Sequence, residues 1–567
     1  MYRLIALLLA LLVSAPANLF AATQQDIESL RKQIEELTEE LEYLSARIDK
    51  PERHATLDRI QWSGDLRVKA DTLHYRDVTF NPGINIDFDD FGARAMQGEF
   101  GNPADPTSAL GQMMAGNPDL AQAFMNGQLA GVMPFAMQEK RTYDLNNDII
   151  YTTRLRLGMK AKVADNVDFI GRLLMYKNWG DSTGVKVFDS WGAFTMDGTN
   201  SGNTTGDWLH VERAFFDWKD IGGSNFYLSI GRRPSTYGAP SHLRENELRG
   251  GTPSGHLVHF NFDGITAGYK LSELTGIEGQ TVRFCYGQGF ESEWGNGEMF
   301  NQINTKDVHL GGFNIDALND GTNFLQLTLF RAMDVTDGFK GLIAFPNQFA
   351  ELFELDLNND LQNFPSFNFV TRVQPATNIG DITLGGIGFT RQEENGINWF
   401  VSGGWTYSEP NGKSGMFGGL LSDPVYRAVL DDTGNIAFAP AGVTDSDNHH
   451  GYSIYLGIQI PSWKGKAGLE YNYGSQYWNP FTQAQDDMIG PKLATRGHVG
   501  EAYYIFDINR NMFLKIGGLY YDYVYTGSGS PVGAPQKVKD VKNGKAVSLL
   551  PAVDTAWDAY LSMTVKF

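Results

Sequence analysis

The chain is poor in cysteine, has no surplus of positive charge, and lacks long apolar runs beyond its first 22 residues. Its 567 residues include one cysteine, Cys285, which excludes an internal disulfide framework, a cysteine-based zinc site and c-type haem attachment. The net charge of −20 argues against nucleic acid as a partner, because the phosphate backbone attracts basic surfaces. With a mean hydropathy of −0.29, no segment beyond residue 22 is apolar enough to form a membrane helix.

Residues 1–22 have the layout of a secretory signal peptide. Arg3 is followed by an apolar run from Leu4 to Val13 and then by small residues. That run is too short to span a bilayer. We therefore expect the chain to be exported and this segment to be removed.

Residues 23–50 are predicted to form a short α-helical coiled coil. Apolar residues recur there at alternating spacings of three and four, which is the heptad pattern of a helix seam, and Pro51 ends it. We expect the seam to hold a homo-oligomer, a dimer or a trimer; the alternative is a helix packed on its own chain. The seam residues are Ile27, Leu30, Ile34, Leu37, Leu41, Leu44 and Ile48.

Alternation with a period of two dominates residues 57–567. In 65–71 every even position is apolar and every odd position charged, and 152–163 and 557–567 alternate in the same way. Many of these segments run for ten residues or more, the length of a tilted transmembrane strand, whereas strands of soluble proteins have about five or six. The chain is also rich in aromatic residues, with 36 Phe, 24 Tyr and 11 Trp, many of them near strand ends. The pattern predicts an all-β fold, a transmembrane antiparallel β-barrel.

Sixteen strands are expected, within a range of 16–18, and an even number is typical of bacterial barrels. The first strand is predicted at 60–71, the second at 149–163 and the sixth at 256–271. Short turns alternate with long connections, of which 72–148 is the longest. Long connections of such barrels face outward, so we expect a protein of the cell outer membrane with its coiled coil in the periplasm. Whether 72–148 closes the lumen stays open.

The coiled-coil start, the first strand at 62–68 and the final strand ending in Phe567 resemble a Gram-negative outer-membrane porin. Residues 226–233 and 262–265 are similar to paired strands of such porins. The nearest resemblance is to an uncharacterised porin-like family with a coiled-coil start and a domain of unknown function. It implies that Phe567, with Val565 and Met563 in phase, is the signal read by the barrel-assembly machinery.

The face opposite the apolar one lines the lumen of a barrel. This places a row of basic side chains inside, facing acidic connections such as 87–90 and 351–360, and predicts a constriction with a transverse field. Paired charges that only keep a wet lumen soluble are the alternative. The expected pore-lining residues are Arg67, Lys69, Arg154, Arg156, Lys160 and Arg172.

Histidines are the candidate bases if the protein is an enzyme, and His256 and His259 are expected on opposite faces of the sixth strand. No GxSxG or HExxH motif accompanies them. We therefore expect no enzyme, no catalytic residue, no metal and no cofactor. The predicted function is passive diffusion of small hydrophilic solutes or ions through a porin. The alternative is a structural barrel, which sheathes an electron-transfer partner or tethers the outer membrane to peptidoglycan or a periplasmic protein. The solute stays open.

Overall fold

The protein is described by a computed structural model that divides into two compact units, residues 1–60 and 61–567. The described residues are 34, 37–38, 60–136, 139–180, 209–259, 261–292, 305–346, 367–373, 377–415, 417–482, 486–548 and 551–567. In the first unit Ile34, Leu37 and Thr38 are helical, and the Thr38 hydroxyl donates to the Ile34 carbonyl at 2.6 Å. The predicted signal peptide and the rest of the predicted coiled coil lie outside the described residues.

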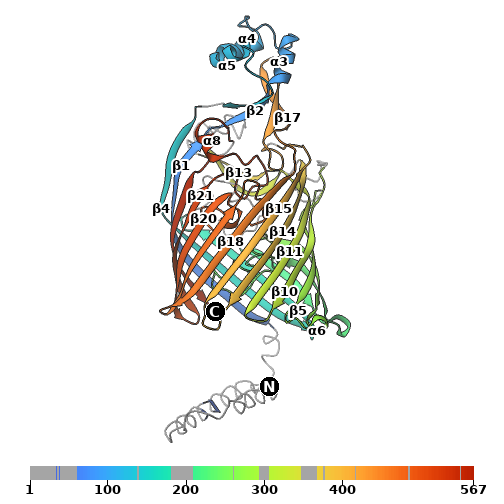
Figure 1. Ribbon diagram of the computed structural model, residues 1–567, viewed down its shortest axis with the longest axis vertical. Coiled ribbons are helices and arrows are strands. Elements are labelled where there is room, and N and C mark those ends of the chain that lie inside the picture. The colour runs from blue at the N-terminus through green and yellow to red at the C-terminus, as the bar shows by residue number, and fades with distance from the viewer. Residues whose placement is uncertain are drawn as a thin grey trace. The chain divides into compact units, whose positions relative to one another are not determined.

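The second unit is a closed antiparallel barrel of sixteen strands (Figure 1), as the alternation predicted. Each barrel strand pairs with the barrel strand that follows it in the sequence, and the last strand, β22, pairs with the first, β1. In spatial order the strands are β1 (Ile60–Phe80), β22 (Thr555–Lys566), β21 (Met512–Tyr523), β20 (Gly497–Asn509), β19 (Gly465–Gly474), β18 (His449–Ser462), β15 (Asn398–Pro410), β14 (Asn378–Gln392), β11 (Asn323–Thr336), β10 (Val308–Asn319), β9 (Thr281–Phe290), β8 (Phe262–Lys270), β7 (Phe226–Arg233), β6 (His210–Trp218), β5 (Val167–Asn178) and β4 (Arg141–Ala164).

Short turns join the strands at one end of the barrel and long connections at the other. We call these the short-turn end and the long-connection end. The turn between β18 and β19, for example, is only 463–464, whereas β15 and β18 are joined by 411–448. Both β1 and β4 are longer than predicted. In β1 the alternation of more buried and less buried side chains continues beyond residue 71 to about residue 77. The longest predicted connection, 72–148, is therefore shortened to 81–140.

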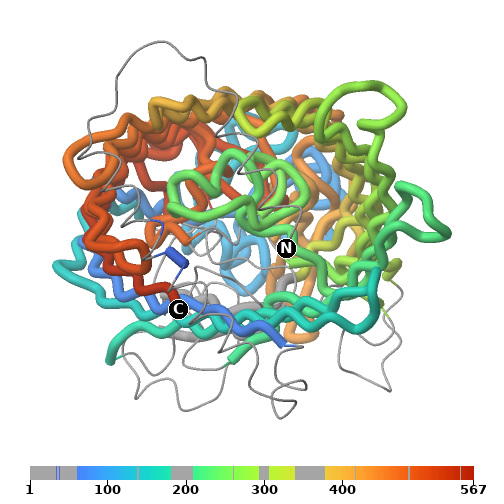
Figure 2. Tube along the Cα trace, turned by 90° about the horizontal axis from the view of Figure 1, so that it is seen from below, coloured from blue at the N-terminus to red at the C-terminus, as the bar shows by residue number. Residues whose placement is uncertain are grey.

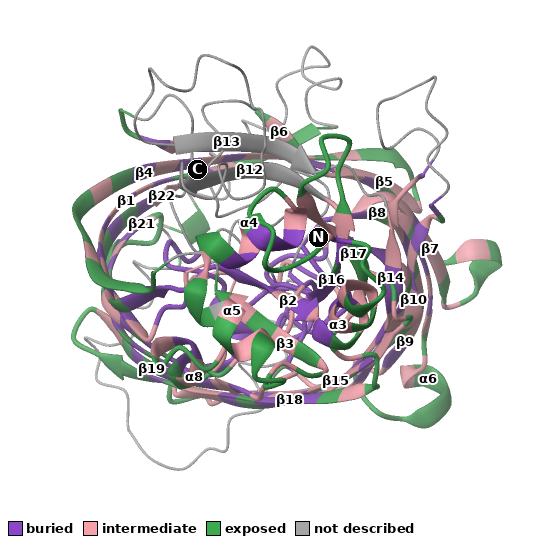
Figure 3. Cartoon of the chain, turned by 90° about the horizontal axis from the view of Figure 1, so that it is seen from above, coloured by how far each residue is buried: buried purple, intermediate pink, exposed green. Residues whose placement is uncertain are grey.

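This connection forms a cap beyond the long-connection end (Figures 1 and 3). Phe91, Phe100 and Leu110 pack there against Tyr426 and Ala428 of the hairpin between β15 and β18. The sheet of the cap has the order β17-β16-β2-β3. The cap contains β2 (Gly83–Asp87), α3 (Phe88–Met96), α4 (Ala109–Gly116), α5 (Pro118–Met125), β3 (Val132–Ala136), β16 (Pro424–Leu430) and β17 (Ile436–Val443).

The remaining elements lie in turns and connections. A separate two-stranded sheet pairs β12 with β13, both in the connection between β11 and β14. Their bounds and those of the short helices are β12 (Phe339–Pro346), β13 (Phe367–Val373), η2 (Ile221–Gly223), α6 (Ser272–Thr275), η4 (Lys492–Ala494) and α8 (Val538–Lys542).

The sixth predicted strand was placed wrongly at its start. In the structure it is β8, which begins at Phe262, so His256 and His259 do not belong to a strand. The cause is that 256–261 is apolar enough to continue the strand pattern, yet 256–259 packs as irregular chain inside the barrel, where Leu257 and Val258 are buried. The expectation that His256 and His259 lie on opposite faces of a strand is therefore wrong.

Candidate functional site

The lumen is where charged side chains converge in this barrel. In β1 the odd-numbered residues from Asp65 to Asp71 point inward and are buried, as are Arg154 and Arg156 of the neighbouring β4. Even-numbered residues of β1 such as Leu66 point outward. Period-two alternation thus gathers basic side chains on one inner wall.

Five of the six expected pore-lining residues meet carboxylates on this wall or near it, inside the lumen. Arg67 pairs with Asp486 and lies 3.8 Å from Glu245. Arg154 contacts Asp486 at 3.2 Å and Glu247 at 3.4 Å. Three others pair as follows: Lys69 with Asp71 at 2.5 Å, Arg156 with Asp65 at 2.7 Å and with Glu247, and Arg172 with Glu212 at 2.5 Å.

Lys160 differs from the other five. Its side chain is 52% exposed, and its ammonium lies 3.5 Å from Asp168 near the short-turn end. We refer to the remaining five, Arg67, Lys69, Arg154, Arg156 and Arg172, as the basic wall. Among the described residues, the pairing carboxylates of the basic wall come from strands and from two connections that enter the barrel, not from the acidic stretch 87–90 in the cap. The other predicted acidic stretch, 351–360, lies outside the described residues.

The connection between β7 and β8 is the first of these, and we call residues 234–259 the inserted segment. Seen from the short-turn end, it lies inside the ring of strands (Figure 2, green). Its Tyr237 is 2% exposed, and the guanidinium groups of Arg154, Arg156 and Arg172 lie 5.3 to 5.8 Å from its ring centre. Cation–π contacts of this kind add to the ion pairs that hold the segment against the basic wall.

Glu247 of the inserted segment is held as a carboxylate. Burial raises the pKa of Glu247, but the guanidinium groups of Arg156 and Arg154 lower it by more. The pKa of Glu247 therefore lies below its usual value. The pair is bidentate on the Arg156 side, where Nη1 donates to Oε2 at 3.1 Å and Nη2 to Oε1. Such paired, desolvated charges fix the position of the segment.

The connection between β19 and β20 supplies the second insertion. Arg244 of the inserted segment pairs with Asp487 of this connection at 2.8 Å and with Glu501 of β20 at 3.0 Å. Lys492 also reaches Glu501, at 2.7 Å, and Glu470 at 2.6 Å. Both insertions are therefore bound to the wall and to each other through charge pairs.

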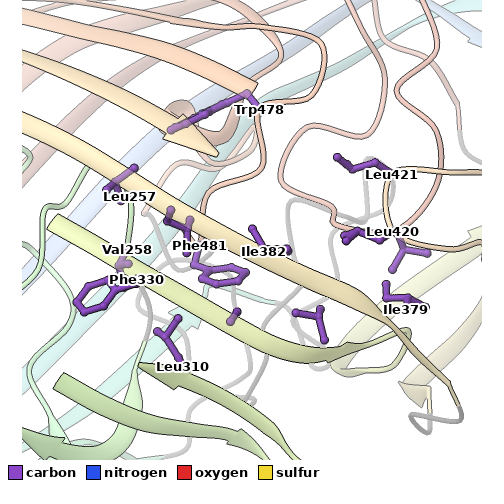
Figure 4. Packing of buried hydrophobic residues seen from close by; sticks show 14 of the residues in the cluster. Leu257, Val258, Leu310, Phe330, Ile379, Ile382, Leu420, Leu421, Trp478 and Phe481 are labelled. Atoms are coloured by element: carbon purple, nitrogen blue, oxygen red, sulfur yellow. The ribbon is translucent and has the colours of Figure 1, made fainter. Parts of the chain in front are cut away.

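An apolar cluster lies inside the barrel on the strands β11 and β14 and the connections next to them (Figure 4). Inward side chains of β11 and β14, such as Phe330 and Leu384, pack there against apolar residues from four connections, among them Leu257, Leu420 and Phe481. The face opposite the apolar one was expected to line the lumen, but on these two strands apolar side chains point inward near the long-connection end. At this end of β14 the outward residues Asp381 and Thr383 are polar, and Asp381 pairs with Arg331 of β11 at 2.8 Å. The polarity of the two faces is therefore inverted there. The sequence signal for this is the change of phase between 381–384 and 387–389.

Two glycines on the barrel strands β14 and β15 let the insertions pack close to the backbone. A Cβ at Gly404 would lie 2.4 Å from the ring of Trp478, and one at Gly386 would lie 2.7 Å from Leu257. Glycine at these two inward positions thus allows the close approach of the second insertion and of the inserted segment. A larger residue would displace them.

His256 and His259 are both buried in the inserted segment. The two ring nitrogens of His256 lie 2.9 Å from the Ser402 hydroxyl and 2.8 Å from the Ser453 hydroxyl. Burial lowers the pKa of His256 to about 3, so the ring is neutral at pH 7 and joins the segment to β15 and β18. In the part of the chain that the structure describes, no group of three or more His, Cys, Asp or Glu is placed to hold a metal ion.

A cavity of about 480 Å³ lies between the inserted segment and the strands of the barrel at the short-turn end. We call this cavity the vestibule. It is bordered by β11, β14, β15, β19 and β22. A second space of about 20 Å³ lies beside the basic wall, roughly enough for one water molecule. Sequence reasoning missed both, because each depends on where the inserted segment runs.

The final strand closes the barrel next to β1. Gly64 and Phe567 exchange backbone hydrogen bonds of 2.8 and 3.0 Å, and a Cβ at Gly64 would lie 2.5 Å from the Phe567 ring. Phe567 is 64% exposed, and Met563 also points outward. Among the described residues no helix is both long and apolar enough to cross a membrane.

A family described as Protein of unknown function (DUF3373) matches residues 144–567, which agrees with the predicted resemblance. No curated protein sequence matches the chain. Solved structures resemble it at low similarity. They include OprB of Pseudomonas putida at high pH (10% identity, 91% of this chain, 96% of that chain, TM-score 0.40). An anion-selective porin from Comamonas acidovorans is also similar (9% identity, 90% of this chain, 99% of that chain, TM-score 0.40). So is OmpT of Vibrio cholerae, an outer-membrane protein (10% identity, 90% of this chain, 97% of that chain, TM-score 0.35).

Proposed function

Because the chain belongs to the DUF3373 family of proteins of unknown function and forms a closed sixteen-stranded barrel, we propose that it is an outer-membrane porin. It passes small hydrophilic solutes or ions by diffusion and has no catalytic role. The observation that carries the proposal is a closed barrel whose outer face is apolar and whose inner face holds charges and a water-accessible vestibule.

The outer face supports a place in lipid. Outward side chains on many strands are apolar and exposed around the barrel, which is costly in water but suits the hydrocarbon core of a bilayer. A closed ring also leaves no unpaired strand edge in the membrane. Examples of this apolar belt, all at least 50% exposed, are Phe313, Leu329, Ile387, Leu469, Ile516 and Leu561.

The inner face supports a narrow, charge-selective passage. The basic wall and the carboxylates of Glu245, Glu247 and Asp486, which pair with it directly, give this part of the lumen fixed charges of both signs, which act strongly on ions at short range. The space beside the wall is small, so we expect low conductance. The inserted segment sets this limit.

Conductance of single channels in planar bilayers tests the proposal. Gly255 N–H donates to the Ala239 carbonyl at 2.8 Å, so residues 240–254 can be removed and the ends rejoined. We expect small discrete steps from the full protein and larger steps from the shortened variant. Shortening the exposed turn 431–435 of the cap hairpin is the control and leaves the steps unchanged.

The absence of steps from both folded proteins would contradict the proposal and favour the structural alternative. In that case the barrel is a sheath for an electron-transfer partner or an outer-membrane tether. A haem protein that co-purifies with the barrel would distinguish the first of these.

A further inference from the structure

The vestibule contains positive charge that the protein itself does not neutralise. Four charged residues line it: Glu247, Arg249, Lys466 and Lys566. Glu247 pairs with Arg154 and Arg156, while Arg249 donates twice to Asp316, at 3.0 and 3.1 Å.

The two lysines are left without an ion-pair partner. Within the described part of the chain, neither Lys466 nor Lys566 has a carboxylate oxygen within 4.0 Å. Lys566 donates to the Asn246 carbonyl at 2.7 Å and lies over the Phe513 ring. Asp507 is the acidic group that acts on Lys466 electrostatically, from beyond that distance.

Both lysines face the lumen and are half-buried. Lys466 stands on β19 in phase with the buried inward residues Glu470 and Asn472, and Lys566 stands on β22 in phase with the buried Thr564. An ammonium has three donors, so each lysine can donate to a bound solute. Partly desolvated charges bind an anion more strongly than exposed lysines do.

His242 adds a further polar group. Its side chain is 6% exposed, and its buried Nδ1 has no hydrogen-bond partner in the described structure. Burial, together with the charges of Arg249 and Lys466, lowers the pKa of His242 to about 4, so the ring is neutral at pH 7. It can then offer a hydrogen bond without adding charge.

The vestibule also has an apolar side. Leu243, Leu248 and Phe324 line it, and Leu248 is 92% exposed. A volume of about 480 Å³ lies within the usual range of small-molecule sites, which combine apolar lining with a few placed polar groups. Inorganic ions alone would leave this apolar surface in water.

From these features we propose that the vestibule is a binding site for a small organic carboxylate, held by Lys466 and Lys566 with its carbon chain against Leu248 and Phe324. The inference rests on the proposed function only in that solutes reach the vestibule through a water-filled barrel end. Binding itself requires no conduction.

Isothermal titration of the detergent-solubilised full chain with succinate tests this site. We expect saturable binding that weakens as ionic strength rises. Succinamide, which has the same carbon chain without charge, does not bind. Removing one charged donor weakens binding about tenfold, so Lys466→Gln and Lys566→Gln each raise the Kd by that factor.

Lys464→Gln is the matched control, since Lys464 lies in the adjacent turn and outside the vestibule, and it leaves the Kd unchanged. Lys466→Arg with Lys566→Arg keeps the charge and retains binding, which guards against loss of folding in the Gln variants. Failure of the wild type to bind succinate, equal binding by the double Gln variant, or equal binding of succinamide would each overturn the site. Because the titration uses no membrane, these results are independent of the conductance that tests the channel.

Discussion

At the residue scale, the lumen depends on charges that compensate one another in a low-dielectric interior. Arg154 and Arg156 are 1% and 3% exposed, and Glu247 bridges them. Removing one member of such a group leaves buried charge uncompensated, which is more harmful than losing an exposed ion pair. The stability of the inserted segment is therefore concentrated in a few carboxylates.

We expect Glu247→Gln to lower the free energy of unfolding at pH 7 by about 3 kcal/mol, the lower end for breaking a buried pair. Asp65 and Asp486 still face the two arginines, which limits the loss. Because the pKa of Glu247 is lower in the folded protein, its contribution is present above the unfolded pKa and disappears as pH falls through the folded pKa. Urea titrations of both proteins from pH 7 into the acid range measure this.

Glu393→Gln is the control, because its partner Arg391 and Glu393 itself are each about a third or more exposed, and exposed pairs contribute roughly 0–1 kcal/mol. A gap between wild type and Glu247→Gln that stays constant at all pH values would show that the carboxylate charge is not what stabilises the segment.

At the element scale, each strand presents one face to the lumen and one to the outside, and the outside face changes character along its length. On β14 the outward residues Phe389 and Ile387 are apolar, whereas Thr383 and Asp381 nearer the long-connection end are polar. The apolar stretch marks the depth of the bilayer core. Beyond it the strand continues in water.

Ile387→Arg is therefore expected to reduce the free energy of folding into phospholipid vesicles by about 2–4 kcal/mol, the cost of an arginine near the bilayer midplane. Trp463→Arg, in the exposed short turn, is the comparison and is expected to cost roughly 0–1 kcal/mol, since the interface tolerates charge. Urea-dependent folding in the same vesicles measures both. Equal costs at the two positions would refute the assigned depth.

At the scale of the whole molecule, we propose that the N-terminal coiled coil associates copies of the barrel. We expect the pair of substitutions Leu37→Asp and Leu44→Asp to convert an oligomer into monomers, because charged residues at seam positions prevent apolar packing. Light scattering of the detergent-solubilised protein measures the mass. Glu39→Gln, off the seam, is the control, and a wild-type monomer would contradict the proposal.

Much of the architecture follows from local chemistry along the chain. Alternation has a period of two in any strand, so the number of strands, their antiparallel order and the inward direction of Arg67 and Arg154 were readable before any tertiary contact was known. The same alternation failed at 256–259, where Leu257 and Val258 are buried without forming a strand. It also ended β1 too early, since polar and apolar residues mix beyond residue 71.

Closure of the barrel decided what the local pattern did not specify. Glu247 lies 91 residues from Arg156, and Asp486 lies 332 residues from Arg154, and no short-range pattern links such positions. Whether a connection enters the lumen or caps it depends on the charges and apolar surfaces that it meets once the ring is closed. That is why 81–140 became the cap, the inserted segment came to lie inside the barrel, and Lys466 and Lys566 came to face the vestibule without a carboxylate partner in the described part of the chain.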